Sequence, residues 1–176
     1  MADQSATTIR PLTAADAPAY RALRLSALAD TPAAFGASHG QEAAEPLDWF
    51  AARLAPPPPS RVYGAFDGDI LIGIAGFLAY HGEKKRHIGL LWGVYLAPAG
   101  RRRGIAAALV GAVIAHARQH VVLLHADVGV DNQPARRLYE RLGFHCYGIQ
   151  PKALRIDGIF HDEAMLALDF SQPPEA

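Results

Sequence analysis

Cysteine is nearly absent from this sequence, since Cys146 is the single one among 176 residues. One cysteine excludes a disulfide framework within the chain and suits a reducing compartment. Net charge is also absent, because 17 lysines and arginines balance 17 aspartates and glutamates. A neutral chain argues against bulk binding to nucleic acid. The longest apolar run, Ile70–Tyr80, is too short to span a bilayer, so we expect no membrane partner.

The chain has the size and composition of one globular domain. Hydrophobic residues make up 51% of it and charged residues 19%, which is an ordinary balance for a protein with a sizeable core. We expect a single domain over residues 1–176, with flexible tails at 1–6 and 171–176. The opening stretch MADQSATTIRPL lacks the charged and then apolar layout of a signal peptide, so we expect a cytoplasmic protein.

The pattern of apolar residues predicts a mixed α/β fold. An Asp-Gly pair at 67–68 separates two apolar runs and predicts a β-hairpin. The segment 31–46 is rich in glycine, proline and alanine and is predicted to be a loop. The order of elements favours a mixed sheet with helices on both faces. Strands are predicted at 8–12, 61–66, 70–80, 88–96, 121–128, 144–149 and 164–170, and helices from 16, at 47–55, from about 104 and at 132–142.

The segment VYLAPAGRRRGIAAALV, residues 94–110, places three arginines directly before an apolar helix. A helix N-terminus is already partly positive, and its first amides have no partner within the helix. Cations there are disfavoured unless an anion binds. Two glycines let the backbone approach a ligand closely, and Ala106 and Ala107 keep the first turn slim. The segment predicts a phosphate or pyrophosphate site; the alternative is a solvated basic turn that binds nothing.

This segment resembles a known family signature. Arg101-x-x-Gly104-x-Ala106, between a strand and a helix, is similar to the Q/R-x-x-G-x-G/A signature of the GCN5-related N-acetyltransferases, in which glycine is commoner at the last position. NQPARRLYERLGF, residues 132–144, matches the family's N-x-x-A-x-x-L-Y-x-x-x-G-F block at every fixed position, and IRPLTAAD, residues 9–16, is similar to its usual start. The resemblance implies a mostly antiparallel sheet with one splayed parallel strand pair, and acetyl-CoA as co-substrate without a metal.

The resemblance also implies which residues hold acetyl-CoA. The loop amides and arginines would bind the pyrophosphate, and the end of strand 88–96 would pair with the pantetheine arm. An amide near Tyr95 would polarise the thioester carbonyl. Asn132 would lie near the arm, although the sequence alone predicts only that it caps its helix. The residues so implied are Val94, Tyr95, Leu96, Arg101, Arg102, Arg103, Gly104, Ile105, Ala106, Ala107 and Asn132.

Three residues are candidates for proton transfer. The resemblance implies Tyr139 as the acid that protonates the leaving thiolate, and a packing tyrosine is the alternative. The general base is left open. Asp127 lies five residues before Asn132, where the ribosomal-protein N-acetyltransferases of the family carry a glutamate. His87, at the entrance of strand 88–96, is the second candidate, because histidine is a common general base near neutral pH. Either could instead be a plain polar residue at a strand end.

The function predicted from the sequence is an acetyl-CoA-dependent N-acetyltransferase that moves the acetyl group directly to a primary amine in a ternary complex. The acceptor is left open between a small molecule and a protein N-terminus or lysine. Acidic residues that could attract the amine are Glu42, Glu45, Asp162 and Glu163, and the alternative for each is a solvated surface residue. The alternative is a catalytically weak acyl-CoA-binding regulatory module. A homodimer is also left open. His116 and His120 lack the glutamate of H-E-x-x-H, so we expect no metal site.

Overall fold

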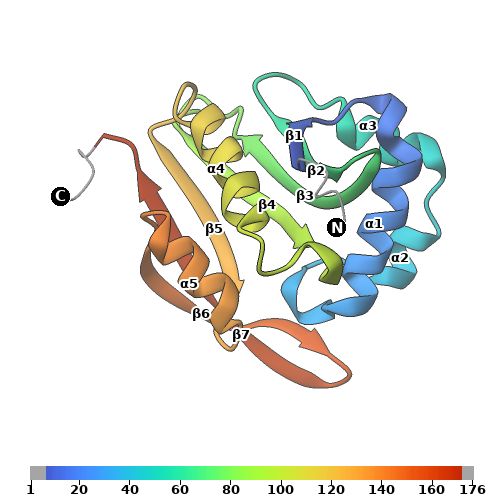
Figure 1. Ribbon diagram of the computed structural model, residues 1–176. Coiled ribbons are helices and arrows are strands. Elements are labelled where there is room, and N and C mark those ends of the chain that lie inside the picture. The colour runs from blue at the N-terminus through green and yellow to red at the C-terminus, as the bar shows by residue number, and fades with distance from the viewer. Residues whose placement is uncertain (1–6, 172–176) are drawn as a thin grey trace.

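The computed structural model describes residues 7–171 (Figure 1). The tails predicted at 1–6 and 171–176 therefore lie outside the described residues, apart from Ser171. In chain order the elements are β1 (Thr7–Pro11), η1 (Ala14–Asp16), α1 (Ala17–Asp30), η2 (Pro32–Ala34), α2 (His39–Ala43), α3 (Leu47–Leu54), β2 (Arg61–Asp67), β3 (Ile70–Ala79), β4 (Ile88–Leu96), η3 (Pro98–Gly100), α4 (Ile105–Ala117), β5 (Leu123–Gly129), α5 (Gln133–Arg141), β6 (His145–Ile156) and β7 (Ile159–Asp169).

The strands form one seven-stranded sheet in the order β1-β2-β3-β4-β5-β7-β6. Every neighbouring pair is antiparallel except β4 and β5, which are parallel and joined through α4. Such a crossover requires a helix over the sheet, whereas the antiparallel pairs need only turns. The predicted mixed α/β fold, mostly antiparallel with one parallel pair, is confirmed.

Helices cover both faces of the sheet, and each side has its own apolar core (Figure 1). On one side, Leu109 and Val113 of α4 pack on strand residues such as Leu124, and α5 contributes Tyr139. On the other side, Tyr20 of α1 and Phe50 of α3 are fully buried against β2 and β3. This second core takes its strand residues from β2, β3 and β4 alone. The face that β5, β7 and β6 present on this side is therefore outside it.

The parallel strands β4 and β5 separate along their length, as Figure 1 shows. They pair from Ile88 opposite Leu123 to Leu91 opposite Ala126, and β4 then continues to Leu96 without β5. Backbone groups of a strand require hydrogen-bond partners. The last part of β4 thus offers a free edge to another extended chain.

A β-bulge reshapes β4 just beyond this point. Ile74 pairs with Tyr95 and Gly76 with Trp92, so two β4 residues, Gly93 and Val94, face one residue of β3. Gly93 has φ +64°, a conformation that glycine adopts without strain. The bulge turns the backbone of β4 where the strands separate.

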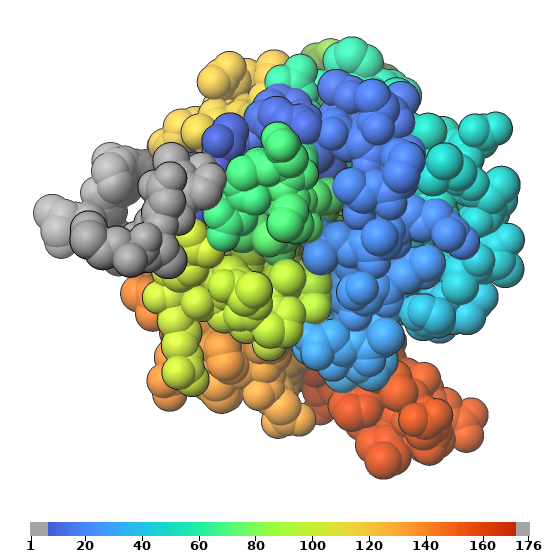
Figure 2. Space-filling model, turned by 45° about the vertical axis from the view of Figure 1, so that its right-hand side comes forward, coloured from blue at the N-terminus to red at the C-terminus, as the bar shows by residue number. Residues whose placement is uncertain are grey.

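Two predictions about local structure were wrong. The predicted loop 31–46 contains η2 and the short helix α2. Ser38 caps α2, because its side chain accepts a hydrogen bond from the Gln41 amide at 3.3 Å. Strands β6 and β7 are longer than predicted and form an extended hairpin. Asp157 and Gly158 make its turn with φ values of 49° and 83°, the same Asp-Gly signal that the sequence shows at 67–68. The hairpin projects near the end of α1 (Figure 2).

Candidate active site

The loop between β4 and α4 has a row of unpaired amides. The Arg101 amide donates to Pro98 O at 3.2 Å and the Ala108 amide to Gly104 O at 3.1 Å. Between them, the amides of residues 102–107 have no acceptor within residues 7–171. Arg102 and Gly104 have φ values of 64° and 74°. Left-handed residues among ordinary ones curve the backbone so that its N–H groups converge, which is how proteins build anion sites.

The three arginines of this loop differ in their surroundings. Arg101 donates to Leu96 O at 3.1 Å and to Asp30 Oδ2 at 2.7 Å. Arg103 donates to Asp67 Oδ2 at 2.8 Å. Arg102 is exposed and makes no ion pair in the part of the chain that the structure describes. Two of the three predicted phosphate ligands therefore already have carboxylate partners, and Arg102 is the one whose charge is available.

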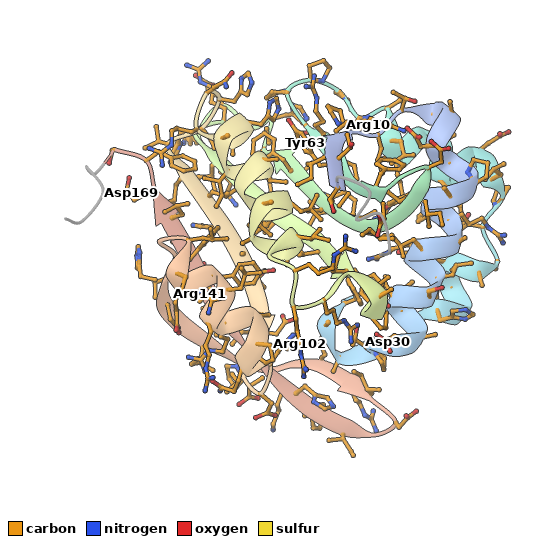
Figure 3. All side chains as sticks on the ribbon, in the orientation of Figure 1. Arg10, Asp30, Tyr63, Arg102, Arg141 and Asp169 are labelled. Atoms are coloured by element: carbon orange, nitrogen blue, oxygen red, sulfur yellow. The ribbon has the colours of Figure 1, made fainter. Side chains whose placement is uncertain are left out.

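Asp30 joins the end of helix α1 to this loop. Its Oδ2 accepts a hydrogen bond from the Tyr95 hydroxyl at 3.2 Å as well as the Arg101 bond. The Arg101 guanidinium holds the pKa of Asp30 below its usual value. Figure 3 shows Asp30 and Arg102 at the same end of the sheet. Both members of the Arg101–Asp30 pair are half-exposed, so its role is to orient the loop more than to stabilise the fold.

Tyr139 lies on the buried side of α5. The helix begins at Asn132, whose Oδ1 accepts a bond from the Ala135 amide at 3.3 Å, so the predicted cap is present. Tyr139 is 6% exposed, and its ring centroid lies 5.6 Å from that of Phe144. It belongs to the same core that Val94 and Leu96 contact. Its hydroxyl makes no hydrogen bond to residues 7–171. Burial raises the pKa of the phenol, which keeps it protonated.

Asp127 lies on the other face of the sheet, the one that β5 and β7 leave outside the helical cores. Its carboxyl keeps contact with solvent, and partial burial raises its pKa. His125 precedes it by two residues on the same face, and burial lowers the pKa of this imidazole. Tyr147 packs 5.4 Å from the His125 ring. Burial, together with the charge of Asp127, raises the pKa of Glu163.

Sequence reasoning missed His125 and Tyr147 as members of this cluster. The alternation in HADVG, residues 125–129, carries the signal for His125, because it sets that residue and Asp127 on one face. Tyr147 sits where the pairing of β6 and β7 shifts, between Cys146 and Gly148, so its direction does not follow from alternation.

The structure does not bring His87 to these residues. It precedes Ile88, the first residue of β4, and its carbonyl accepts bonds from the amides of Val122 and Leu123 at 2.9 and 3.1 Å. Val94 lies seven residues further along, which at the rise of a strand is roughly 20 Å. Of the two candidate bases, Asp127 is the one near the separating strands.

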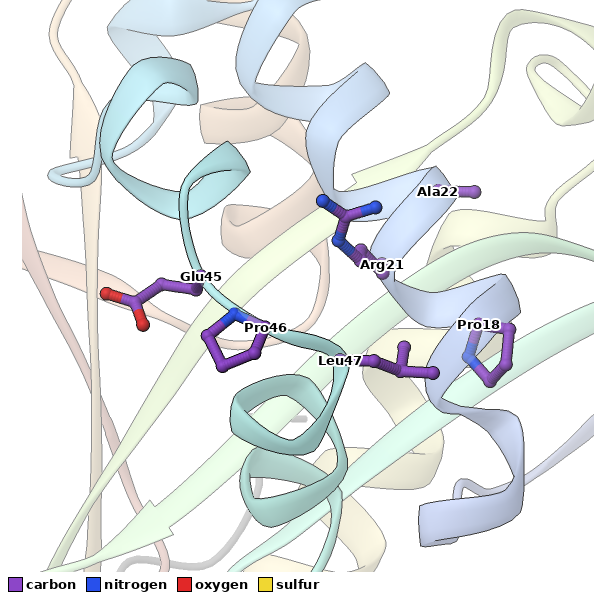
Figure 4. Close-up of a pocket in the computed structure, with 6 residues that line it drawn as sticks. All are labelled: Pro18, Arg21, Ala22, Glu45, Pro46 and Leu47. Atoms are coloured by element: carbon purple, nitrogen blue, oxygen red, sulfur yellow. The ribbon is translucent and has the colours of Figure 1, made fainter.

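Glu42 cannot attract an amine as expected, because it is buried in an ion pair with Arg24. A pocket of about 470 Å³ between α1 and the segment after α2 (Figure 4) also lies away from the predicted residues. Its charged lining residues are Arg21 and Glu45, and it contains none of the groups named for catalysis. Among residues 7–171, no three His, Cys, Asp or Glu side chains are grouped as metal ligands would be.

His116, one of the two histidines compared with a zinc-binding motif, is hydrogen-bonded through Nε2 to Pro59 O at 2.8 Å. No helix within the described range is long and apolar enough to cross a membrane.

Comparison with solved structures shows that other proteins share this fold. The acetyltransferase of the GNAT family from Streptococcus pneumoniae superposes with a TM-score of 0.83 at 22% identity, over 93% of this chain and 99% of that one. The Salmonella typhimurium protein yncA, solved with its cofactor acetyl-CoA, gives 0.79 at 22% identity over 98% of each chain. The ribosomal-protein-alanine N-acetyltransferase from Brucella melitensis gives 0.76 at 24% identity over 92% and 99%.

At these identities the solved structures establish the fold. Among curated proteins, no sequence matches this chain. The sequence model of the Acetyltransferase (GNAT) family, however, matches residues 22–144. Enzymes of that family take acetyl groups from acetyl-CoA. The chain therefore belongs to the GNAT family of acetyltransferases.

Proposed function

We propose that this protein is an N-acetyltransferase that moves the acetyl group of acetyl-CoA directly to a primary amine in a ternary complex. One observation carries the proposal. The free edge of β4 beyond Leu91 leads straight into the loop whose amides at 102–107 lack acceptors. An extended amide-containing arm that ends in a pyrophosphate fits both features at once.

Each part of this region has a separate binding role. The amides of residues 102–107 and the Arg102 guanidinium would hold the pyrophosphate, with Ile105, Ala106 and Ala107 forming the first turn beneath it. Val94, Tyr95 and Leu96 would pair with the pantetheine arm. The bulge at Gly93 and Val94 would turn a β4 amide toward the thioester carbonyl. Bound acetyl-CoA would supply the activated acyl group.

Two residues on opposite faces would move the protons. Tyr139, kept neutral by burial, would donate its proton to the leaving sulfur. Asp127, on the open face, would accept a proton from the incoming ammonium, either directly or through a water molecule. This division of roles suits a reaction in which donor and acceptor approach from different sides of the sheet.

Replacing Asp127 by asparagine should lower kcat/KM by about 100-fold, the lower end for general base catalysis. The carboxyl must be ionised to accept a proton, so wild-type activity should fall as pH drops through a pKa that burial raises above the usual aspartate value. The measurement is a pH–rate profile for both proteins. The acid limb should be absent in D127N. H87Q is the control and should keep it; a limb that disappears only in H87Q would assign the base to His87.

Replacing Arg102 by glutamine should weaken acetyl-CoA binding about tenfold, because one charge-assisted contact to the pyrophosphate is lost. Arg103→Gln, whose guanidinium is engaged by Asp67, should have a smaller effect. Calorimetric titration with acetyl-CoA and with acetyl-pantetheine, which lacks the pyrophosphate, separates the contributions. Equal weakening toward both donors would contradict the assignment of Arg102 to the pyrophosphate.

The competing function is a binding module that senses acyl-CoA without turnover. The test is release of free thiol from acetyl-CoA against amines and N-terminal peptides. Turnover with any acceptor class supports the transferase, whereas tight acetyl-CoA binding without turnover across the panel favours the module. The acid–base cluster of His125, Asp127 and Glu163 favours the transferase, since a sensor has no need of it.

A further inference from the structure

Two arginines share one carboxylate beneath helix α1. Glu42 accepts hydrogen bonds from Arg24 Nε at 2.9 Å and from Arg24 Nη2 at 2.8 Å, and both side chains are 5% exposed. Arg53 Nη1 lies 4.0 Å from the same carboxylate. Glu42 is therefore committed to Arg24 by two short charge-assisted bonds. Arg53 has only a long contact with it.

This cluster carries one positive charge more than it neutralises. Arg24 Nη1 and Arg53 Nε are buried and have no hydrogen-bond partner within residues 7–171, and the same holds for the Tyr20 hydroxyl. Tyr20 does not supply an anion, because burial raises the pKa of its phenol and keeps it neutral. Unpartnered buried polar groups cost free energy. The N–H groups of Arg24 Nη1 and Arg53 Nε therefore remain donors for an oxygen acceptor.

Arg53 presents its charge at the wall of a hollow. Arg53 Cζ lies 4.6 Å from the centroid of the Trp49 ring and 4.9 Å from that of the Trp92 ring. The Arg53 side chain is 29% exposed. The hollow has a volume of about 300 Å³, and its lining residues are Arg53, Pro56, Ser60, Phe77, Leu78 and Trp92. One cation set in a mainly apolar wall suits an anionic group carried by an apolar body.

The hollow adjoins the place where β4 and β5 separate. Trp92 follows Leu91, the last β4 residue paired with β5, and its ring lies close over Gly76, where a Cβ would come within 2.3 Å of it. Continuing the register would set Asp127 opposite Trp92. Arg24 Nη1 lies 3.8 Å from the Cβ position of Gly93, directly under the bulge. By this register Asp127 lies one strand away from Trp92, a residue of the hollow that also holds Arg53.

We propose that the acceptor is an aminocarboxylate with an apolar body, whose carboxylate binds Arg53 between the two tryptophans while its amine faces Asp127. The inference rests on the proposed function and narrows its acceptor class. Arg53 selects the substrate by its charge and takes no part in proton transfer. A neutral amine of the same shape would leave the guanidinium without its partner.

Binding at this site can be measured without turnover. Trp49 and Trp92 are the only two tryptophans of the sequence, so intrinsic fluorescence reports on the surroundings of Arg53. The probes are phenylalanine and 6-aminohexanoate, which differ in the distance between amine and carboxylate and so test different separations of Arg53 and Asp127. Each is paired with its amide, which lacks the negative charge. At least one acid should give a saturable change that its amide does not. Arg53→Met should weaken that response at least tenfold. Arg141→Met is the matched control, since Arg141 is exposed and makes no ion pair within residues 7–171.

Kinetics with acetyl-CoA test the same site during turnover. The favoured acid should exceed its amide at least tenfold in kcat/KM, and Arg53→Met should abolish the preference through KM while kcat changes little. Arg53→Lys keeps the charge but loses the planar fork, so it should retain part of the preference. It also guards against a folding defect in the methionine variant.

The two proposals fail in different ways. Equal turnover of acid and amide, or an Arg53→Met variant that lowers both alike, would overturn the acceptor inference and leave the transferase in place. Saturable binding of the acid without any acetyl transfer to it or to its amide would support the site at Arg53 and overturn the proposed function.

Discussion

Replacing Tyr139 by phenylalanine is expected to lower kcat by about 10³-fold, within the range that general acid catalysis contributes. The substitution removes one hydroxyl and leaves the ring that packs on Phe144. Because the hydroxyl makes no hydrogen bond within residues 7–171, the free energy of unfolding should change little. Acetyl-CoA affinity should also be kept, since the binding groups lie on β4 and in the loop before α4. Stopped-time assays of thiol release and calorimetric titration with acetyl-CoA measure the two quantities separately.

The burial of Tyr139 also predicts how the activity of the wild-type protein depends on pH. Burial raises the pKa of Tyr139, so the phenol stays protonated throughout the neutral and mildly alkaline range. Wild-type activity should therefore not begin to fall as the pH passes the ordinary pKa of a tyrosine. Tyr63→Phe, on β2, is the control and should behave as wild type. A Tyr139→Phe variant with unchanged kcat, or one that loses acetyl-CoA binding in parallel, would show that the residue only packs.

Replacing Glu42 by glutamine is expected to destabilise the fold by about 3–5 kcal/mol, the range for removing one partner of a buried ion pair. The Arg24 and Glu42 side chains are each 5% exposed, so the remaining guanidinium could not be hydrated in place. Arg53 would also lose its nearest carboxylate. Urea unfolding followed by circular dichroism gives the free energy directly.

A nearby control and a double variant sharpen this result. Glu45→Gln removes a charge from the same segment, but Glu45 makes no ion pair among the described residues, so its effect should stay within about 0.5 kcal/mol. Arg24→Met combined with Glu42→Leu removes both charges and should be far less destabilising than Glu42→Gln. Equal losses for the single and double variants would mean that packing, not charge, accounts for the effect.

The acceptor inference depends on this same ion pair. With Glu42 bound to Arg24, the charge of Arg53 is left for a ligand. A substitution at Glu42 that still folds should tighten carboxylate binding at Arg53 further, because even the long 4.0 Å contact with Glu42 partly neutralises the Arg53 charge. Sequence reasoning assigned Glu42 the opposite task, that of attracting a cation, and the structure corrects it.

The parts of the site that are made by residues close together in the chain could be predicted from the sequence alone. The amides, glycines and arginines of residues 101–107 lie within one turn and one helix start, and Asn132 caps the helix that carries Tyr139. Backbone sterics and helix-end hydrogen bonding act over a few residues, so spacing alone predicts them. The strand-turn-strand pattern at 61–80 was predictable for the same reason.

Contacts between distant segments needed the tertiary structure. The partners of Arg101 and Arg103 lie 71 and 36 residues away, and no local pattern shows that Asp30 and Asp67 would meet them. The separation of β4 from β5 depends on where pairing stops between strands joined by a whole helix. Arg24 and Glu42 are 18 residues apart, and their burial depends on how α1, α2 and α3 pack together. Charge and residue type are written in the chain, but which charge is neutralised and which remains free is decided by packing, because burial and distance set the strength of every ion pair.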